Sequence, residues 1–198
     1  MQESARPNDA PDINARIAAR VRGLRGNLGM SLEDLSARCG VSRSMISLIE
    51  RGETSPTAVV LEKLAAGLGV PLAALFDDPA LPPSPVSRRD DRVTWRDPET
   101  GYLRRNISPA SFPSSIHLVE VTLPPGARVA YESASLQDVD QQVWVQDGRV
   151  EVTVGETTHH LAADDCVAMT LAEPITYSNR TRKSARYIVA IAKGGLRK

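Results

Sequence analysis

The stretch Ser42-Arg43-Ser44-Met45-Ile46-Ser47-Leu48-Ile49-Glu50-Arg51-Gly52 has the features of one short helix with a defined start and a defined end. Ser42 can accept hydrogen bonds from the free N–H groups of the first turn, and Gly52 can adopt the left-handed conformation that ends a helix. Ile46 and Ile49 share one face, which can be buried. The other faces are largely polar, an arrangement that suits the major groove of DNA.

Helical patterns also flank this stretch on both sides. Ser31-Leu32-Glu33-Asp34 resembles a capping box at the start of a helix, and Gly40-Val41 forms a tight turn into Ser42. Two short helices joined in this way make a helix-turn-helix. The five predicted helices are Asp12–Leu28, Ser31–Gly40, Ser42–Arg51, Ser55–Leu68 and Pro71–Phe76, and together they can form one small core over residues 12–78.

Proline-rich segments without periodicity lie on either side of this helical domain. Residues 1–11 are polar and lack an apolar core, so we expect a disordered tail and no secretory signal. The composition of residues 79–92 predicts an extended, semi-rigid linker.

Residues 93–198 have the pattern of short strands separated by turns. The predicted strands are Ile116–Leu123, Gln142–Gln146, Arg149–Val154, Thr157–Leu161, Cys166–Leu171, Ile175–Ser178 and Ala185–Ala192. Asp147-Gly148 is a strong hairpin signal between two of them. The spacing favours an antiparallel sandwich or barrel.

Charge and composition restrict the class of protein. The chain has 24 Lys and Arg against 24 Asp and Glu, and this balance is weakly against nucleic-acid binding. The distribution of charge along the chain matters more than the net charge. A local basic face on the first helix is possible, because this helix carries Arg16, Arg20, Arg22 and Arg25. No apolar run approaches the roughly 20 residues of a membrane span, so we expect a cytoplasmic protein.

Two cysteines, Cys39 and Cys166, are far apart in the sequence. In a chain without a secretory signal we expect two reduced, partly buried thiols. No pair of cysteines and no cluster of cysteine and histidine has the spacing of a zinc site.

The helical segment from Ile13 to Phe76 resembles the lambda-repressor-like, or XRE-type, DNA-binding domain. The residues that carry this likeness are Met30–Ser36, Gly40–Ser44, Ile49–Gly52, Ser55-Pro56, Leu61–Ala65 and Leu68–Leu72. By this likeness, Arg43, Ser44, Ser47 and Leu48 face base edges, and Ser31, Leu32, Ser42 and Arg51 are candidates for phosphate contacts. It also implies an ion pair between Arg25 and Glu50 that orients the recognition helix.

Domains of this class bind palindromic operators in double-stranded DNA as dimers. We therefore expect a homodimer, with the second domain supplying much of the interface.

The segment from Pro124 to Lys193 resembles the small cupin β-barrel. Pro125-Gly126, Gln141–Gly148, Leu161–Asp165 and Asn179 carry the likeness. Together the two halves resemble bacterial regulators of the XRE–cupin family, which implies an α + β protein with a five-helix DNA-binding domain and an antiparallel cupin barrel.

The metal ligands of the cupin pattern are missing from this chain. Counting back from Gly148 places Ser135, Gln137 and Gln141 at the ligand positions, whereas counting from Gly126 places Glu132, Ala134 and Asp138 there. The second motif has Ile175 where a histidine is expected. His159 and His160 are adjacent and would face opposite sides of a strand. We therefore expect no metal, no cofactor and no catalytic residues.

A barrel without metal can still hold a small molecule. The predicted effector-binding residues are Ser135, Gln137, Gln141 and Tyr177, with His117 and Arg128 as candidates for binding an anionic group. The hypothesis is a transcriptional repressor controlled by a small-molecule effector that acts through the linker. The alternatives are a metal-dependent cupin enzyme with an appended DNA-binding domain and, with less support, a partner-binding antitoxin.

Overall fold

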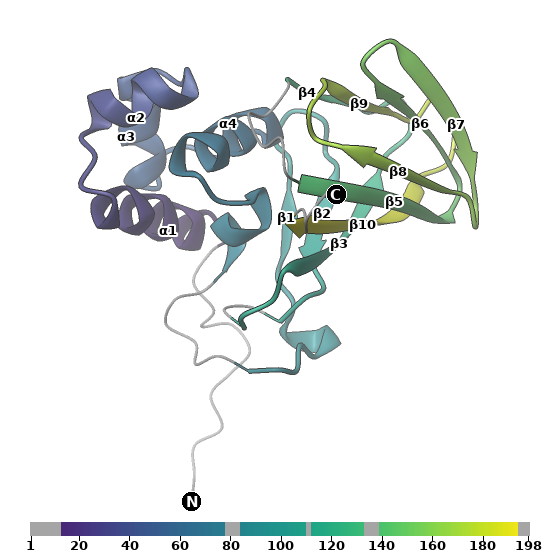
Figure 1. The fold of residues 1–198 in the computed structure, drawn as a ribbon, viewed down its shortest axis with the longest axis horizontal. Helices are drawn as coiled ribbons and strands as arrows, with labels where there is room; N and C mark the ends of the chain where they lie inside the picture. The colour runs from purple at the N-terminus through teal and green to yellow at the C-terminus, as the bar shows by residue number, and fades with distance from the viewer. Residues whose placement is uncertain (1–12, 78–83, 110–111, 133–138, 194–198) are drawn as a thin grey trace, which may run out of the picture.

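A computed structural model describes residues 13–77, 84–109, 112–132 and 139–193, in which a helical part is followed by two antiparallel sheets (Figure 1). The helical part contains α1 (Ile13–Asn27), α2 (Leu32–Cys39), α3 (Arg43–Glu50), α4 (Ala58–Leu68) and the 3₁₀ turn η1 (Leu72–Phe76). The α + β organisation and the helix-turn-helix are confirmed. The predicted tail lies outside the described residues, as does Asp12, and so does the first part of the predicted linker.

The starts of the helices follow the predicted capping pattern. Ser31 and Asp34 form a reciprocal capping box, in which the Ser31 hydroxyl accepts from the Asp34 N–H at 3.1 Å. The Ser42 hydroxyl accepts from the N–H of Met45 at 3.3 Å and starts α3. These contacts join residues that are close in the chain, which explains why the sequence predicts them so closely.

The prediction of a fifth α-helix is wrong, because the described residues contain four. The segment after Pro71 is the five-residue 3₁₀ turn η1, in which the Ala74 N–H donates to the Pro71 carbonyl at 2.9 Å. Pro71 provides no side-chain cap, and the backbone is already extended at Asp77. A segment this short gains too few hydrogen bonds to settle into α geometry.

Two sheets face one another beside the helices, on the right in Figure 1. The six-stranded sheet has the order β1 (Thr94–Arg96), β2 (Leu103–Asn106), β3 (Ile116–Leu123), β10 (Ala185–Lys193), β5 (Val139–Asp147), β8 (Cys166–Thr170). The four-stranded sheet has the order β4 (Arg128–Tyr131), β9 (Ile175–Ser178), β6 (Arg149–Val154), β7 (Thr157–Ala162). The strands predicted from the sequence are present within a few residues of their predicted ends.

The prediction of a closed barrel is wrong. No ladder joins an edge strand of one sheet to the other anywhere in the described ranges. The chain passes between sheets through turns, one at Pro124-Pro125, where the N–H groups needed for pairing are missing. Between β7 and β8, Asp164 has a left-handed backbone, and only isolated bonds from this turn reach Val145. The sandwich that the strand spacing also allowed is the structure observed.

The predicted hairpin at Asp147-Gly148 is wrong as well. β5 pairs with β10 and β8, whereas β6 pairs with β7 and β9, so this turn carries the chain from one sheet to the other. Gly148 has φ 78°, and a Cβ there would lie 2.7 Å from the carbonyl oxygen of Ser184. The glycine therefore permits a close crossing over the start of β10.

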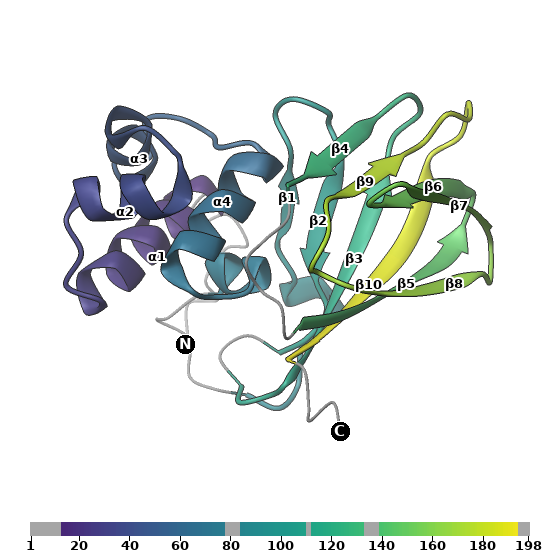
Figure 2. The same cartoon turned by 45° about the horizontal axis from the view of Figure 1, so that its top comes forward.

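The helical part and the sheets pack against each other. In Figure 2, α4 lies between the other helices and the strands. The Phe76 ring meets the buried Trp95 ring edge-on, with 5.7 Å between the ring centroids. The buried Asp97 carboxylate, just after β1, accepts from the Ala58 N–H at 2.9 Å and so adds a second cap to α4. These contacts hold α4 and η1 against β1 and β2.

The two thiols differ in their exposure. Cys39 is buried and Cys166 is exposed, so the expectation of partial burial fails for Cys166; both are free. Burial raises the pKa of the Cys39 thiol.

In the part of the chain that the structure describes, none of the helices is both long enough and apolar enough to span a membrane.

Candidate DNA-binding surface and ligand cavity

The recognition helix α3 presents the predicted face to solvent. Ile46 and Ile49 are buried beneath it, whereas Arg43 and Ser44 are exposed. Ser47 and Leu48 are half-buried. Base contact by these residues stays a prediction.

The candidates for phosphate contacts already have partners within the chain. The hydroxyls of Ser31 and Ser42 accept from N–H groups in the first turns of α2 and α3. The Arg51 guanidinium forms two hydrogen bonds with the Glu53 carboxylate, at 2.6 and 2.8 Å. Leu32 is half-buried at the start of α2. A phosphate at this surface would therefore meet backbone N–H groups or would draw Arg51 away from Glu53.

The predicted ion pair between Arg25 and Glu50 is present. Nε and Nη2 of Arg25 donate to the two carboxylate oxygens of Glu50 at 2.7 and 2.8 Å. Glu50 is buried, and its hydrogen bonds raise the pKa of Arg25. Arg25 also donates to the Met30 carbonyl at 2.7 Å, so one side chain joins α1, α3 and the loop before α2. The pair thus fixes the angle at which α3 is presented.

Three arginines of α1 form hydrogen bonds within the helical part, so they contribute less to a basic surface than the sequence suggested. Arg20 donates to the carbonyl of Ala74 in η1 at 3.0 Å, and Arg22 donates to the carbonyl of Glu50. Arg25 pairs with the Glu50 carboxylate, so these three arginines are all engaged within the chain. The exposed arginines Arg43 and Arg51, at the two ends of α3, are better placed to attract DNA.

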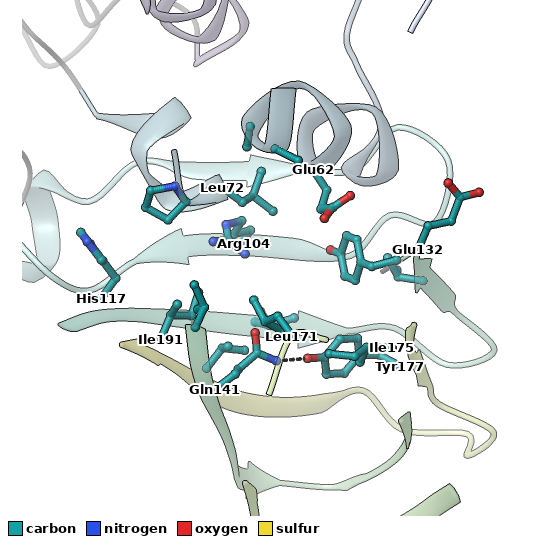
Figure 3. A pocket seen from close by; sticks show the side chains of 18 of the residues that line it. Glu62, Leu72, Arg104, His117, Glu132, Gln141, Leu171, Ile175, Tyr177 and Ile191 are labelled. Atoms are coloured by element: carbon teal, nitrogen blue, oxygen red, sulfur yellow. Dashed lines mark hydrogen bonds between the residues drawn. The ribbon is translucent and has the colours of Figure 1, made fainter. Parts of the chain in front are cut away.

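A cavity of about 130 Å³ lies between the helical part and the sheets. One wall comes from α4 and the segment after it, including Glu62, Ala66 and Leu72. The opposite walls come from both sheets, as Figure 3 shows for Arg104 on β2 and Tyr177 on β9. The cavity therefore opens onto residues of the helix-turn-helix part as well as onto the sandwich.

Buried hydroxyl and amide groups lie among apolar side chains in this cavity. The amide of Gln141 donates to the hydroxyl of Tyr177, drawn as a dashed line in Figure 3. The hydroxyls of Tyr102 and Tyr131 are 3.2 Å apart. Burial raises the pKa of all three tyrosines. They therefore stay neutral at physiological pH and can both donate and accept hydrogen bonds.

The predicted effector residues are only partly brought together. Gln141, Tyr177 and His117 line the cavity, whereas Arg128 is exposed on β4 and does not contribute to the lining. Ser135 and Gln137 lie outside the described residues. The sequence prediction missed Arg104, which among the described residues is the one arginine that lines the cavity.

The histidines and acidic residues do not form a metal site in the described ranges. Between residues 13 and 193, outside the gaps given above, no three His, Cys, Asp or Glu side chains converge in a way that could hold an ion. His160 is exposed on β7, where its Nδ1 lies 3.4 Å from the Glu151 carboxylate on the neighbouring strand, and His159 is half-buried.

Known proteins resemble the chain at two levels. The helix-turn-helix family model matches residues 21–75. A control protein from Mycoplasma, C.MunI, is 37% identical over 68 residues, which cover 34% of this chain and 92% of that protein. The transcriptional regulator SutR of Escherichia coli is 40% identical over 63 residues, 32% of this chain and 35% of its own length. The match thus spans about a third of that relative.

A solved structure resembles nearly the whole chain. The helix-turn-helix family transcriptional regulator from Vibrio cholerae superimposes with a TM-score of 0.72 at 27% identity, covering 91% of this chain and 96% of that one. The likeness therefore includes the sheets as well as the helices.

Proposed function

This chain belongs to the XRE-type helix-turn-helix family of transcriptional regulators, and we propose that it is a repressor controlled by a small molecule bound in the cavity between α4 and the sheets. The observation that carries the proposal is the composition of the cavity wall. Residues of α4 form part of it, so a bound molecule would touch the DNA-binding part directly.

The helix α4 connects the cavity to the helix-turn-helix. Gly67 of α4 lies so close to α2 that a Cβ on it would be 2.7 Å from the Cβ of Cys39. Other residues of α4, among them Glu62 and Ala66, line the cavity. A ligand that favours one position of α4 can therefore shift α2 and α3, provided that it binds the two positions with different affinity. This route supplements the linker as a path for the signal.

The proposed DNA contacts are made by a homodimer on a palindromic operator. Arg43 would pair with a guanine edge, and Ser44, Ser47 and Leu48 would contact neighbouring bases. Selection of binding sequences from random DNA, with sedimentation to measure the oligomeric state, tests both parts. Failure to enrich any DNA sequence would contradict the proposal of sequence-specific DNA binding.

We expect Arg43→Ala to weaken operator binding by more than about tenfold, since a good base contact contributes about 1–3 kcal/mol. Arg43 is exposed and its interaction with Glu33, at 3.7 Å, is weak, so the thermal midpoint should not change. A gel shift against the selected operator measures the loss. Arg149→Ala, which changes an exposed arginine on β6, is the matched control and should bind as the wild type does.

The metal-dependent enzyme remains the alternative to test. It would require a metal-binding group of side chains, and the described residues contain no convergent set of three His, Cys, Asp or Glu. A tightly held, stoichiometric metal in the purified protein would favour the metal-dependent enzyme over the regulator.

A further inference from the structure

We propose that Arg104 binds the carboxylate of a small organic acid in the cavity and that this acid is the effector. The inference rests on the proposed function, in which the cavity holds the controlling molecule, and it adds the chemical class of that molecule and the residue that recognises it.

Arg104 carries a charge that no side chain in the described residues neutralises. The residue is 6% exposed, and its Nε and Nη2 atoms are buried without any hydrogen-bond partner. No ion pair joins it to another residue in the ranges described above, although its guanidinium interacts with the Tyr102 hydroxyl. A buried charge without a counter-charge destabilises a fold strongly. An arginine in this position therefore needs an anion that the described side chains do not supply.

The guanidinium of Arg104 stacks on an aromatic ring. Its central carbon lies 5.4 Å from the centroid of the Phe76 ring, so the ring covers one face of the group. Stacking on a face leaves the edge of the planar group available, and that edge carries the parallel N–H donors that match a carboxylate. The Phe76 contact thus holds Arg104 in place without using the donors.

The walls of the cavity are mostly apolar. Apolar side chains such as Val121, Ile175 and Ile191 surround the polar groups. An engineered apolar cavity of about 150 Å³ holds benzene, so one of this size suits roughly six to nine non-hydrogen atoms. The ligand would be a compact acid with an apolar body, and the tyrosine hydroxyls could bond its other polar atoms.

Acidic residues of the protein limit where the acid group can lie. Glu132 is at the rim, away from Arg104 in Figure 3, and it is paired with Lys63 at 3.0 Å. Glu62 projects from α4 into the same space (Figure 3). A ligand carboxylate would be repelled near these groups and attracted at Arg104, which orients its apolar body between α4 and the sheets.

The position of Arg104 also explains how the acid could be sensed. Phe76 belongs to η1, which follows α4 closely in the chain, so the side chain that would hold the acid already contacts the helical part. Pairing with a carboxylate would change the strength of this contact. The signal would then pass from β2 through Phe76 to α4.

The test uses thermal unfolding of the full chain with matched acids and amides. Isovalerate and benzoate, each at about 10 mM, should raise the midpoint by about 2 °C or more, whereas isovaleramide and benzamide should not. Inorganic phosphate serves as the other class of anion. Equal shifts with acids and amides, a shift with phosphate alone, or no shift at all would overturn the proposal.

Variants of two neighbouring arginines make the test specific. Arg104→Met should fold and should lose the response to both acids, and Arg104→Gln provides a second variant of the same kind. Arg105→Met is the control, because Arg105 is the next residue of β2 and pairs with Glu120, outside the cavity lining. It should keep the full response. An Arg104→Met protein that responds as the wild type does would contradict the assignment.

Operator binding separates this inference from the proposed function. If the selected operator binds but neither acid shifts the midpoint, the proposed function as a DNA-binding regulator is retained and the proposal of an organic acid bound by Arg104 is contradicted. If the acids act through Arg104, their addition should change operator affinity by at least about fivefold, the lower range of allosteric coupling. Acid binding without any change in operator affinity would overturn the role as effector.

Discussion

Each of the two parts of the molecule contains an arginine that is largely shielded from solvent, half-buried Arg25 in the helices and buried Arg104 in the sheets, and the two differ in their partners. In the helical part, Arg25 forms two hydrogen bonds with the buried Glu50 carboxylate. In the sheets, Arg104 has an aromatic ring against one face and two nitrogen atoms without partners. The paired Arg25 fixes the orientation of the recognition helix, whereas the unpaired Arg104 lies in the cavity, where an anionic ligand can pair with it. From this contrast we infer that the pairing of a shielded charge, more than its degree of exposure, distinguishes a structural role from a binding role.

Breaking the satisfied pair should have the largest effect. Glu50→Ala would leave the half-buried Arg25 without its counter-charge and without two charged hydrogen bonds, and we expect the free energy of unfolding to fall by about 2 kcal/mol. Operator binding should fall too, because α3 loses its orientation. Urea unfolding and a gel shift measure these changes. Glu53→Ala, which removes the exposed partner of Arg51, is the control and should leave stability nearly unchanged.

Removing the unsatisfied charge should have a smaller effect of opposite sign. Arg104→Met keeps a flexible apolar side chain against Phe76 and eliminates a buried charge, so without added ligand we expect a gain of about 1 kcal/mol in the free energy of unfolding. Urea unfolding in a buffer free of organic acids measures it. A loss of more than about 1 kcal/mol would mean that Arg104 supports the fold as Arg25 does, and the comparison would fail.

The effect expected at Glu62 depends on pH. Burial raises the pKa of its carboxyl to about 7 from a usual value of 4.5. Below pH 4.5 the carboxyl is protonated in both the folded and the unfolded chain, so the group does not oppose folding there. As the pH rises from 4.5 to about 7, the unfolded chain loses its proton first and stability falls. Above this range the folded protein must hold the ionised group.

Glu62→Gln should therefore raise the thermal midpoint at about pH 8 and leave it nearly unchanged at about pH 4, below the usual pKa of a glutamate. Midpoints measured across this range test the direction. Glu156→Gln, at the exposed turn between β6 and β7, is the matched control. An equal change at both pH values would show that Glu62 acts by packing alone.

The sequence predicts best what depends on neighbouring residues. The capping box of Ser31 and Asp34 joins residues within one turn, and it is present as expected. The Arg25–Glu50 pair was implied by family likeness, and it too is present. By contrast, a turn signal such as Asp147-Gly148 specifies a change of direction but not the sheet that receives the next strand. That choice depends on β9 and β10, which come later in the chain.

The cavity was harder to predict because its residues come from distant segments. Gln141, from the cupin-like spacing, and Tyr177 were both predicted as polar groups of the pocket, and they do meet. Arg104 could not be found in this way, since its burial depends on Phe76, far earlier in the chain, and on the close approach of the helical part. The local sign of it was its position in β2 two residues after the buried Tyr102, which directly precedes that strand.

The Asp97 carboxylate has a consequence for exchanging the parts of this protein. It follows β1, yet it caps the first turn of α4 through Ala58, and the Thr100 N–H donates to its other oxygen at 2.7 Å. One of the caps of α4 is therefore supplied by a residue that directly follows a strand of the sheets. A chimera that joins these helices to an unrelated sensor would have to supply an acceptor at the same place. The two parts of this chain are thus less interchangeable than their separate folds suggest.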